Sequence, residues 1–395
     1  MNTIKLPATR RRANGFSMVE LLVSIVIGLL ALGFATRLVV RAEAGKQAAL
    51  GGSDAMQNGV LALFSMQREL NQAGWSINDP LIVGCDTVFA DSGNYAMLTA
   101  ARGGVTVTPL AAVVIQSNGS APDRVSINSG TSMSNTGMAR LSGDYAAGAA
   151  LDIDRAPYGF TGTDTALAGG DVIVVAPEAA GASKCVLAQV SGTVAPGTPN
   201  GQNRILIAAD ANNRFNTGGL GVAFPSLQAR LFNLGPASSL SFHTWSVDRG
   251  FLQLRASNLS GAMAAPAPVT DNIVSLKAQY GFDRRGVAQF TPELGMQVTT
   301  WSGVMLDADN DGVIGSAGDY QRIAAARIAV VARSRAPERA NASGACTATP
   351  NLPTVFGNVS VTVAVSGDTV DWHCYRYRVF ETIVPIRNSA WRPTA

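Results

Sequence analysis

The chain has few charged side chains and very few histidines. Of its 395 residues, 14% are Asp, Glu, Lys or Arg, and only His243 and His373 are histidine. These two lie in unrelated β-like stretches, and the sequence contains neither a G-x-S-x-G turn nor a Walker-type phosphate loop. A hydrolytic triad and a nucleotide site are therefore not expected. Each histidine is better interpreted as a hydrogen-bonded structural residue, and the chain is predicted not to be an enzyme.

Excess positive charge is also missing from most of the chain. The formal net charge is +3, but Lys5, Arg10, Arg11 and Arg12 supply four of the positive charges. If the chain is cut after Gly15, 26 Lys and Arg remain against 27 Asp and Glu, a net charge of about −1. Nucleic-acid binding would need a basic stripe on the folded part, so no direct binding is expected. The basic cluster instead precedes an apolar run, where it would hold the N-terminus in the cytoplasm.

Cysteine is scarce, and none of it has metal-ligand spacing. The four residues are Cys85, Cys185, Cys346 and Cys374, without a C-x-x-C pair or a nearby histidine cluster. In an exported chain they predict two disulfides. Three connectivities are possible, and Cys85–Cys185 with Cys346–Cys374 is favoured because it closes the shorter loops.

One long apolar run stands near the N-terminus. Residues 21–36 carry no charge, and Arg37 and Arg41 follow them. This is about the minimum length for a helix that crosses a bilayer. A secretory signal peptide would be cleaved after such a run, but the convincing processing site, between Gly15 and Phe16, precedes it. Cleavage there removes the basic cluster and leaves an apolar helix on the mature protein.

A single acid, Glu20, interrupts the start of this apolar helix. An ionised group at membrane depth costs about 2.5–3.5 kcal/mol on insertion scales, so Glu20 needs a partner. After cleavage, Phe16 would carry a free α-amine on the same helical face, four residues away. The carboxylate can neutralise that amine within one subunit or between stacked subunits. Glu20 is therefore predicted to set the register of helix packing during assembly, which a plain single-pass anchor would not require.

The helix is predicted to continue beyond the membrane, because no proline occurs between Pro7 and Pro80. Its apolar face would consist of Met56, Val60, Leu63, Phe64 and Leu70. Three glycines weaken its middle by about 1 kcal/mol each and predict a flexible joint there: Gly45, Gly51 and Gly52. Gly74 is a plausible end.

From about Pro80 the pattern changes to short β-like runs between turn residues. The expected strands are 110–116, 171–175, 185–190, 204–208, 240–247, 251–255, 273–282, 327–334, 359–365 and 375–386. Residues 117–215 are rich in Gly, Ala, Ser and Thr without a clear period, and are interpreted as loops and edge strands inserted in the head. The expected divisions are a leader (1–15), a membrane helix (16–40), its amphipathic continuation (41–75) and a β-rich head with long loops (76–395).

One segment has the character of a cation site. Asp307, Asp309 and Asp311 alternate and are followed by glycine, which is the start of a calcium loop. The twelfth position is Gly318, which has no side chain, and Asp319 comes one place late, so an EF-hand is not expected. Two interpretations stay open: a structural calcium site, or a solvated acidic turn. No other cofactor is required.

The N-terminal residues resemble the class III signal of type IV pilins and of type II secretion pseudopilins: Gly15, Phe16, Ser17, Met18, Val19, Glu20 and Leu21. The resemblance implies cleavage between Gly15 and Phe16 by a prepilin peptidase and N-methylation of Phe16. It also implies that Glu20 is the glutamate found at the fifth position of mature pilins.

Four later stretches resemble PilW-type minor pilins: 63–75 (LFSMQRELNQAGW), 271–283 (DNIVSLKAQYGFD), 327–334 (RIAVVARS) and 375–388 (YRYRVFETIVPIRN). The mid-membrane proline common in major pilins is missing and Arg37 lies near that point, which suits a minor subunit. The implied fold is α+β and type IV pilin-like, with a long N-terminal helix packed on a large antiparallel β-rich head.

The resemblance implies a structural minor pilin that joins other minor pilins, the major pilin and the inner-membrane assembly platform. It would prime pilus assembly or sit at the tip, and support twitching, adhesion or DNA uptake. The protein would span the inner membrane once, with its head in the periplasm, and reach the pilus at the cell surface after assembly. The alternatives are a minor pseudopilin of a type II secretion system and a tip adhesin whose loops bind surfaces. A membrane-tethered enzyme would need a convergent set of titratable residues, which the sequence does not show.

Overall fold

The computed structural model describes residues 17–133, 139–164, 169–195, 202–291, 293–341 and 343–389. The chain divides into two compact units, Met1–Gly51 and Gly52–Ala395. Each is considered by itself below.

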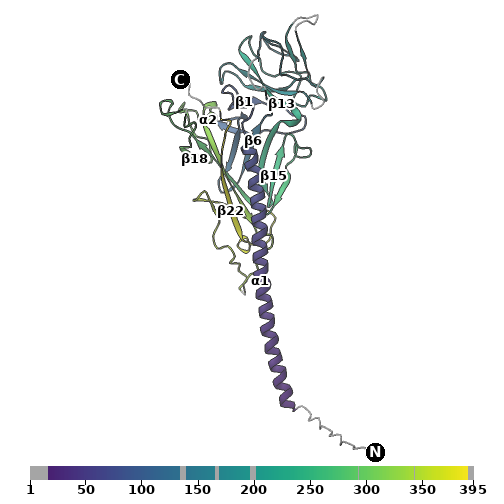
Figure 1. The fold of residues 1–395 in the computed structure, drawn as a ribbon, viewed down its shortest axis with the longest axis vertical. Helices are drawn as coiled ribbons and strands as arrows, with labels where there is room; N and C mark the ends of the chain where they lie inside the picture. The colour runs from purple at the N-terminus through teal and green to yellow at the C-terminus, as the bar shows by residue number, and fades with distance from the viewer. Residues whose placement is uncertain are drawn as a thin grey trace, which may run out of the picture. The chain divides into compact units, whose positions relative to one another are not determined.

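A single helix, α1 (Met18–Leu70), contributes to both units and is drawn in purple in Figure 1. It contains no proline, so no main-chain N–H is missing from its i→i−4 hydrogen bonds. Gly45, Gly51 and Gly52 weaken this helix but do not interrupt it. After Leu70 the chain turns, and Gly74 adopts a φ of 83°, a left-handed conformation that favours glycine.

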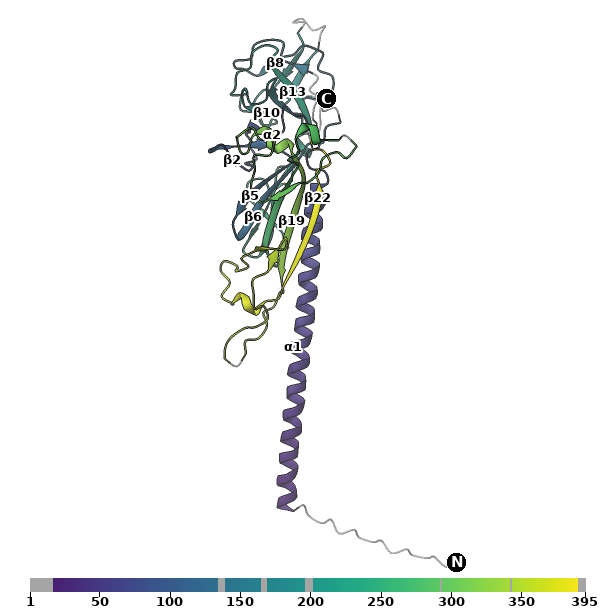
Figure 2. The same cartoon turned by 90° about the vertical axis from the view of Figure 1, so that its left-hand side faces the viewer.

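Two antiparallel sheets of the second unit share a core with the end of α1. The first sheet has the order β16-β15-β14-β6-β5, with β5 (Val113–Asn118), β6 (Ala121–Ser129), β14 (Ser241–Asp248), β15 (Phe251–Ala256) and β16 (Ala267–Asp271). The second has the order β18-β17-β19-β22, with β17 (Ile273–Phe282), β18 (Thr300–Ser302), β19 (Ile323–Arg333) and β22 (Tyr377–Pro385). Their shared core holds Trp245, Tyr280, Phe282 and Ile328 together with Met66 of α1. Figure 2 shows β5, β6, β19 and β22 beside the upper part of the helix.

A third sheet has the order β4-β1-β10-β9-β13-β7. Its strands are β1 (Cys85–Val88), β4 (Pro109–Leu110), β7 (Ala139–Arg140), β9 (Asp171–Pro177), β10 (Cys185–Gln189) and β13 (Ala229–Pro236). The β1–β10 pair is parallel, and the other pairs of this sheet are antiparallel. Both faces of this sheet are covered, because its strands supply side chains to two separate clusters of buried apolar residues.

The prediction that 117–215 holds only loops and edge strands is wrong for β6, β9 and β10, which lie inside their sheets. Every residue of β9 and of β10 is buried. A strand that is buried on both faces has no alternation of polar and apolar residues, so β9 and β10, although expected as strands, were wrongly interpreted as edge strands.

Smaller elements complete the second unit. The strands β8 (Ala150–Asp152), β11 (Gly192–Val194) and β12 (Arg204–Leu206) form a three-stranded sheet. Two short hairpins pair β2 (Ala100–Arg102) with β3 (Val105–Val107), and β20 (Thr354–Val355) with β21 (Val359–Ser360). A five-residue helix, α2 (Ala317–Gln321), precedes β19. The expected α+β class, with an N-terminal helix and a largely antiparallel β-rich head, is confirmed; the parallel β1–β10 pair is the exception to the antiparallel pattern.

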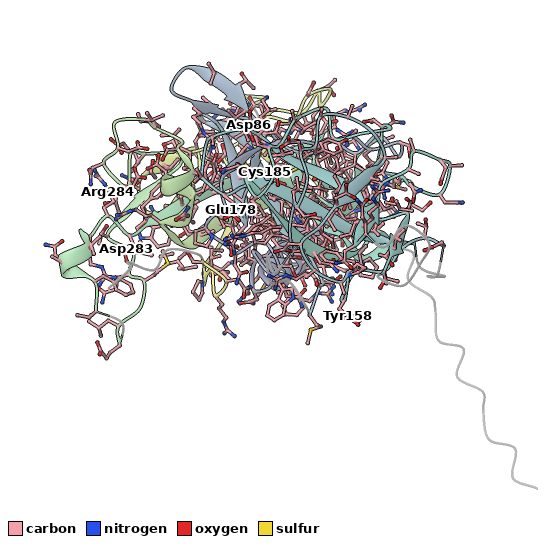
Figure 3. All side chains as sticks on the ribbon, turned by 90° about the horizontal axis from the view of Figure 1, so that it is seen from above. Asp86, Tyr158, Glu178, Cys185, Asp283 and Arg284 are labelled. Carbon is pink, nitrogen blue, oxygen red and sulfur yellow. A yellow bond between two sulfur atoms is a disulfide. The ribbon has the colours of Figure 1, made fainter. Side chains whose placement is uncertain are left out.

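Of the three connectivities open to the cysteines, the structure has Cys85–Cys185 and Cys346–Cys374. The first joins β1 to the neighbouring β10 (Cys185 and Asp86 of this region are labelled in Figure 3). Asp86, which follows Cys85, forms an ion pair with Lys184. The first disulfide spans 100 residues of sequence, whereas the second closes a loop of 28.

Candidate assembly surface

The first unit carries an apolar helical span with no covering of its own. Residues Met18–Val40 have a mean hydropathy of 2.4, and none of this span is buried within the chain. By length and composition it can cross a membrane. A continuous apolar surface of this kind requires lipid or other apolar helices as its environment.

Polar groups in this span differ in how they are satisfied. The hydroxyls of Ser24 and Thr36 donate to main-chain oxygens one turn earlier, those of Glu20 at 2.7 Å and Leu32 at 2.9 Å. These bonds lower the cost of placing a hydroxyl in lipid. The exposed Glu20 carboxylate, by contrast, has no hydrogen-bond partner among the described residues. It stands in the first turn of α1, where the helix dipole favours a negative charge. Gly15 and Phe16, the predicted cleavage and methylation positions, lie outside the described residues.

In the second unit, α1 packs against the core through one stripe of residues, which are small at its start and larger at its end. Ala55, Ala62, Met66 and Leu70 are fully buried, at the spacing of one helical face. Gly59 continues this stripe beneath Phe380 of β22, where an added Cβ would lie 2.1 Å from the aromatic ring. The small side chains therefore let the helix approach the sheet closely.

The opposite face of this part of α1 carries large apolar residues exposed to solvent: Met56, Val60, Leu61 and Phe64, each between 49% and 62% exposed. We call these four residues the outer face. The predicted core-facing stripe is thus wrong for Met56, Val60 and Phe64, while Leu70 is buried and Leu63 packs at the edge of the core. The large and the small residues follow the same period, so periodicity alone could not decide which face is covered.

The last turn of α1 is fixed to the sheet through a partly buried carboxylate. Glu69 Oε1 accepts a hydrogen bond from His243 Nδ1 (2.8 Å), and its Oε2 accepts one from Trp245 Nε1 (2.6 Å). Burial opposes the charge on His243, but Glu69 outweighs this effect, and the net result raises the pKa of His243. The second histidine, His373, is paired with Asp371 at 2.6 Å.

Ser241 lies near the same group, which brings a serine, a histidine and an acid together. Its Oγ is 3.2 Å from His243 Nε2, but the same nitrogen lies closer, at 2.8 Å, to Asn258 Oδ1. Both ring nitrogens therefore face oxygen acceptors, an arrangement that favours the protonated imidazolium. A protonated His243 cannot take a proton from Ser241, so this cluster is suited to anchoring the helix.

Comparisons with known proteins agree with this arrangement. Residues 10–36 match the family described as the prokaryotic N-terminal methylation motif, and residues 245–388 match Type IV Pilus-assembly protein W. In these two regions the chain resembles proteins of type IV pilus assembly. The second match covers β15 to β22, and so includes three of the four stretches that carried the resemblance. Both families point to a structural protein of pilus assembly.

One solved structure similar to this chain is the type IV-like pilin TTHA1219 from Thermus thermophilus. The two share 11% identity over 85% of this chain and 97% of the other, with a TM-score of 0.29, which supports no argument about the head. No curated protein matches the chain.

The structure also brings together the three acids of the predicted calcium loop. Carboxylate oxygens of Asp307, Asp309 and Asp311 lie within 4.8 Å of one another. Asp307 Oδ1 is buried without a hydrogen-bond partner, so it is free to bind a cation. Asp319 cannot join them as it stands, because its carboxylate accepts N–H groups from residues 308, 309, 315 and 316. Burial raises the pKa of Asp319. A calcium ion would thus have three side-chain ligands in this turn of the head.

Proposed function

We propose that this PilW-type chain is a minor pilin, which enters a type IV pilus through its N-terminal helix. The observation that carries the proposal is the uncovered apolar span Met18–Val40 with Glu20 in its first turn, whose carboxylate has no partner among the described residues. The methylation-motif match over residues 10–36 supports it. In this proposal residues 1–15 are a leader that a prepilin peptidase removes, and the chain spans the inner membrane with its head in the periplasm.

Assembly then transfers the span from lipid to a bundle of similar helices. The apolar surface stays out of water in both places, so the transfer costs little hydrophobic free energy. An unpaired carboxylate favours the step, because a new α-amine on Phe16 of this or a neighbouring subunit supplies the missing positive charge. The energy gained by pairing would select the subunit stagger that brings the two groups together.

We place the subunit with other minor pilins at the start or tip of the filament, where it primes assembly. The support is the size of the second unit, which has three large sheets and extends from Gly52 to Ala395. In a main polymer every copy of such a head would have to pack against identical heads on several sides. At the tip it needs to fit only the subunits beneath it.

The test is deletion of the gene, followed by complementation with the unmutated chain, Glu20→Ala or Glu43→Ala. Glu43 is the matched control, an exposed acid of the same helix beyond the apolar span. We expect surface pili in electron micrographs with the unmutated chain and with Glu43→Ala, and few or none with Glu20→Ala. N-terminal sequencing should find Phe16 first. Normal pili together with a defect in protein secretion would assign the chain to a type II secretion system instead.

A further inference from the structure

The outer face of α1 leads directly into a polar cleft. From Phe64, the next residue on that side of the helix is Arg68, four positions and about 6 Å along the axis. Arg68 lines a cleft of about 700 Å³, together with Asn71, Gln72 and Trp75. The apolar residues and the cleft therefore form one continuous strip of surface along the end of α1.

Segments distant in sequence close the other sides of the cleft. They are the end of β6, the start of β14 and the C-terminal residues Arg387 and Asn388. The Asn388 side chain donates to the main-chain oxygen of Ala73 at 3.1 Å, which holds this C-terminal segment against the end of α1. The cleft is thus built by the tertiary fold.

Positive charge in this cleft is not neutralised. Arg68 and Arg387 both line it, and within the described part of the chain neither guanidinium has an ion pair or a side-chain hydrogen bond. The acid in the lining, Glu69, already accepts from His243 and Trp245 with its two oxygens. Guanidinium groups bind carboxylates with two parallel hydrogen bonds, so the cleft is suited to an incoming carboxylate.

Trp75 gives the cleft an aromatic wall. Its indole is 44% exposed, and its N–H donates to Ser132 O at 3.0 Å, which fixes the orientation of the ring. Exposed tryptophan and arginine side chains around a concavity are the residues that contribute most to protein–protein binding energy.

We propose that this strip docks a helix of a different pilus subunit. The partner's apolar side covers the outer face, and an Asp or Glu about one turn further along enters the cleft between Arg68 and Arg387. This inference rests on the proposed assembly into a filament. An acidic sugar could use the cleft and Trp75, but it would leave the outer face uncovered. A parallel second copy in register would place Arg68 against Arg68, so charge complementarity favours another subunit.

The test is site-specific photocrosslinking in cells that assemble the pilus, using the full chain. A benzoylphenylalanine replaces Phe64 on the outer face, or Gln72 in the cleft. Tyr158, which is 90% exposed in another part of the head (labelled in Figure 3), is the control position. We expect positions 64 and 72 to crosslink to one helix of another subunit, with an acid about one turn beyond the apolar contact. Crosslinks to polysaccharide, to lipid alone, to a second copy or to nothing would overturn the proposal.

A charge exchange then tests the role of the cleft. Arg68→Glu should lower the crosslinking yield from position 64 about tenfold, and replacement of the partner's acid by Arg should restore it. Failure of that rescue rejects the ion pair. If the chain reaches the pilus with Phe16 at its N-terminus but crosslinks elsewhere, this inference fails while the proposed function stands. If the chain never enters pili, both fail.

Discussion

The packing of α1 on β22 can be tested at Gly59, where two effects of opposite sign compete. Replacing a helical glycine by alanine stabilises a helix by about 1 kcal/mol. At Gly59, however, the new Cβ would lie 2.1 Å from the Phe380 ring, whereas carbon atoms pack at about 3.5–4.0 Å. The ring must move by roughly 1.5 Å, and overpacking of this kind costs about 1–3 kcal/mol. We therefore expect Gly59→Ala to destabilise the head by about 1 kcal/mol.

The sign should reverse once the ring is removed. In a Phe380→Ala background, Gly59→Ala should stabilise by about 1 kcal/mol, which gives a coupling energy of about 2 kcal/mol in the double-mutant cycle. Gly52→Ala is the control, because its added Cβ meets only Arg378 Nη2 at 3.8 Å; it should stabilise both backgrounds equally. The assay is urea unfolding of a soluble form starting at Arg41, with an unchanged m-value as the condition for comparison. Equal stabilisation by Gly59→Ala in both backgrounds would refute the packing described here.

Three further predictions concern the head. The folded state raises the pKa of His243, so its pairing with Glu69 stabilises fully below about pH 6.5 and is lost as pH rises through the raised value. The stability difference between the unmutated chain and Glu69→Gln should shrink between pH 6 and pH 9, and a constant difference would contradict this. At the acidic turn we propose a structural calcium ion. Millimolar calcium should raise the Tm of the unmutated protein, and the double substitution Asp309→Asn with Asp311→Asn should abolish this rise. If calcium does not change the Tm of the unmutated protein, the calcium site is rejected. Replacing Cys85 and Cys185 by serines should lower the free energy of unfolding in urea by about 4–5 kcal/mol. This is roughly 1 kcal/mol more than the loss expected for the Cys346–Cys374 disulfide, because the first disulfide closes the longer loop. Equal losses for the two disulfides would argue against the loop-entropy explanation.

Elements with a strong local pattern could be predicted from the sequence. Residues 273–282 were expected as a strand and form β17 with the same bounds, since apolar residues alternate there with Ser275, Lys277 and Gln279. The long helix was expected because no proline interrupts the apolar run or the periodic stretch that follows it.

β6 could not be predicted in this way. It contains Pro122 near its start, and proline usually argues against an interior strand. Ser126 and Asn128 are buried in it and are satisfied by groups distant in sequence: Ser126 Oγ donates to His243 O, and Asn128 Nδ2 to Ala111 O. Tertiary hydrogen bonds offset the cost of burying these polar side chains. The local sequence of β6 does not show those bonds, so it could not predict the strand.

The residues of the candidate site also differ in whether the sequence alone could identify them. Glu20 could be identified from sequence, because an acid in an apolar run is a local anomaly. The Glu69 anchor could not, because its partners His243 and Trp245 are 174 and 176 residues away. Arg68 and Arg387 are ordinary surface arginines until the fold places them in one cleft.

The relative contributions of the apolar span and the outer face to assembly follow from their sizes. Full burial of a large apolar side chain stabilises by about 1.5–3 kcal/mol. Each of the four outer-face residues is about half exposed, so a partner that covers it could supply about half of that free energy. Their sum, about 3–6 kcal/mol, reaches only the lower part of the roughly 4–15 kcal/mol that association costs in lost freedom. The outer face alone therefore cannot hold a partner from solution. It can orient a partner that the membrane spans already hold close, since effective concentration then offsets much of that cost. Outer-face variants should consequently alter which subunit is the neighbour while the chain still enters the filament, whereas loss of Glu20 should prevent entry.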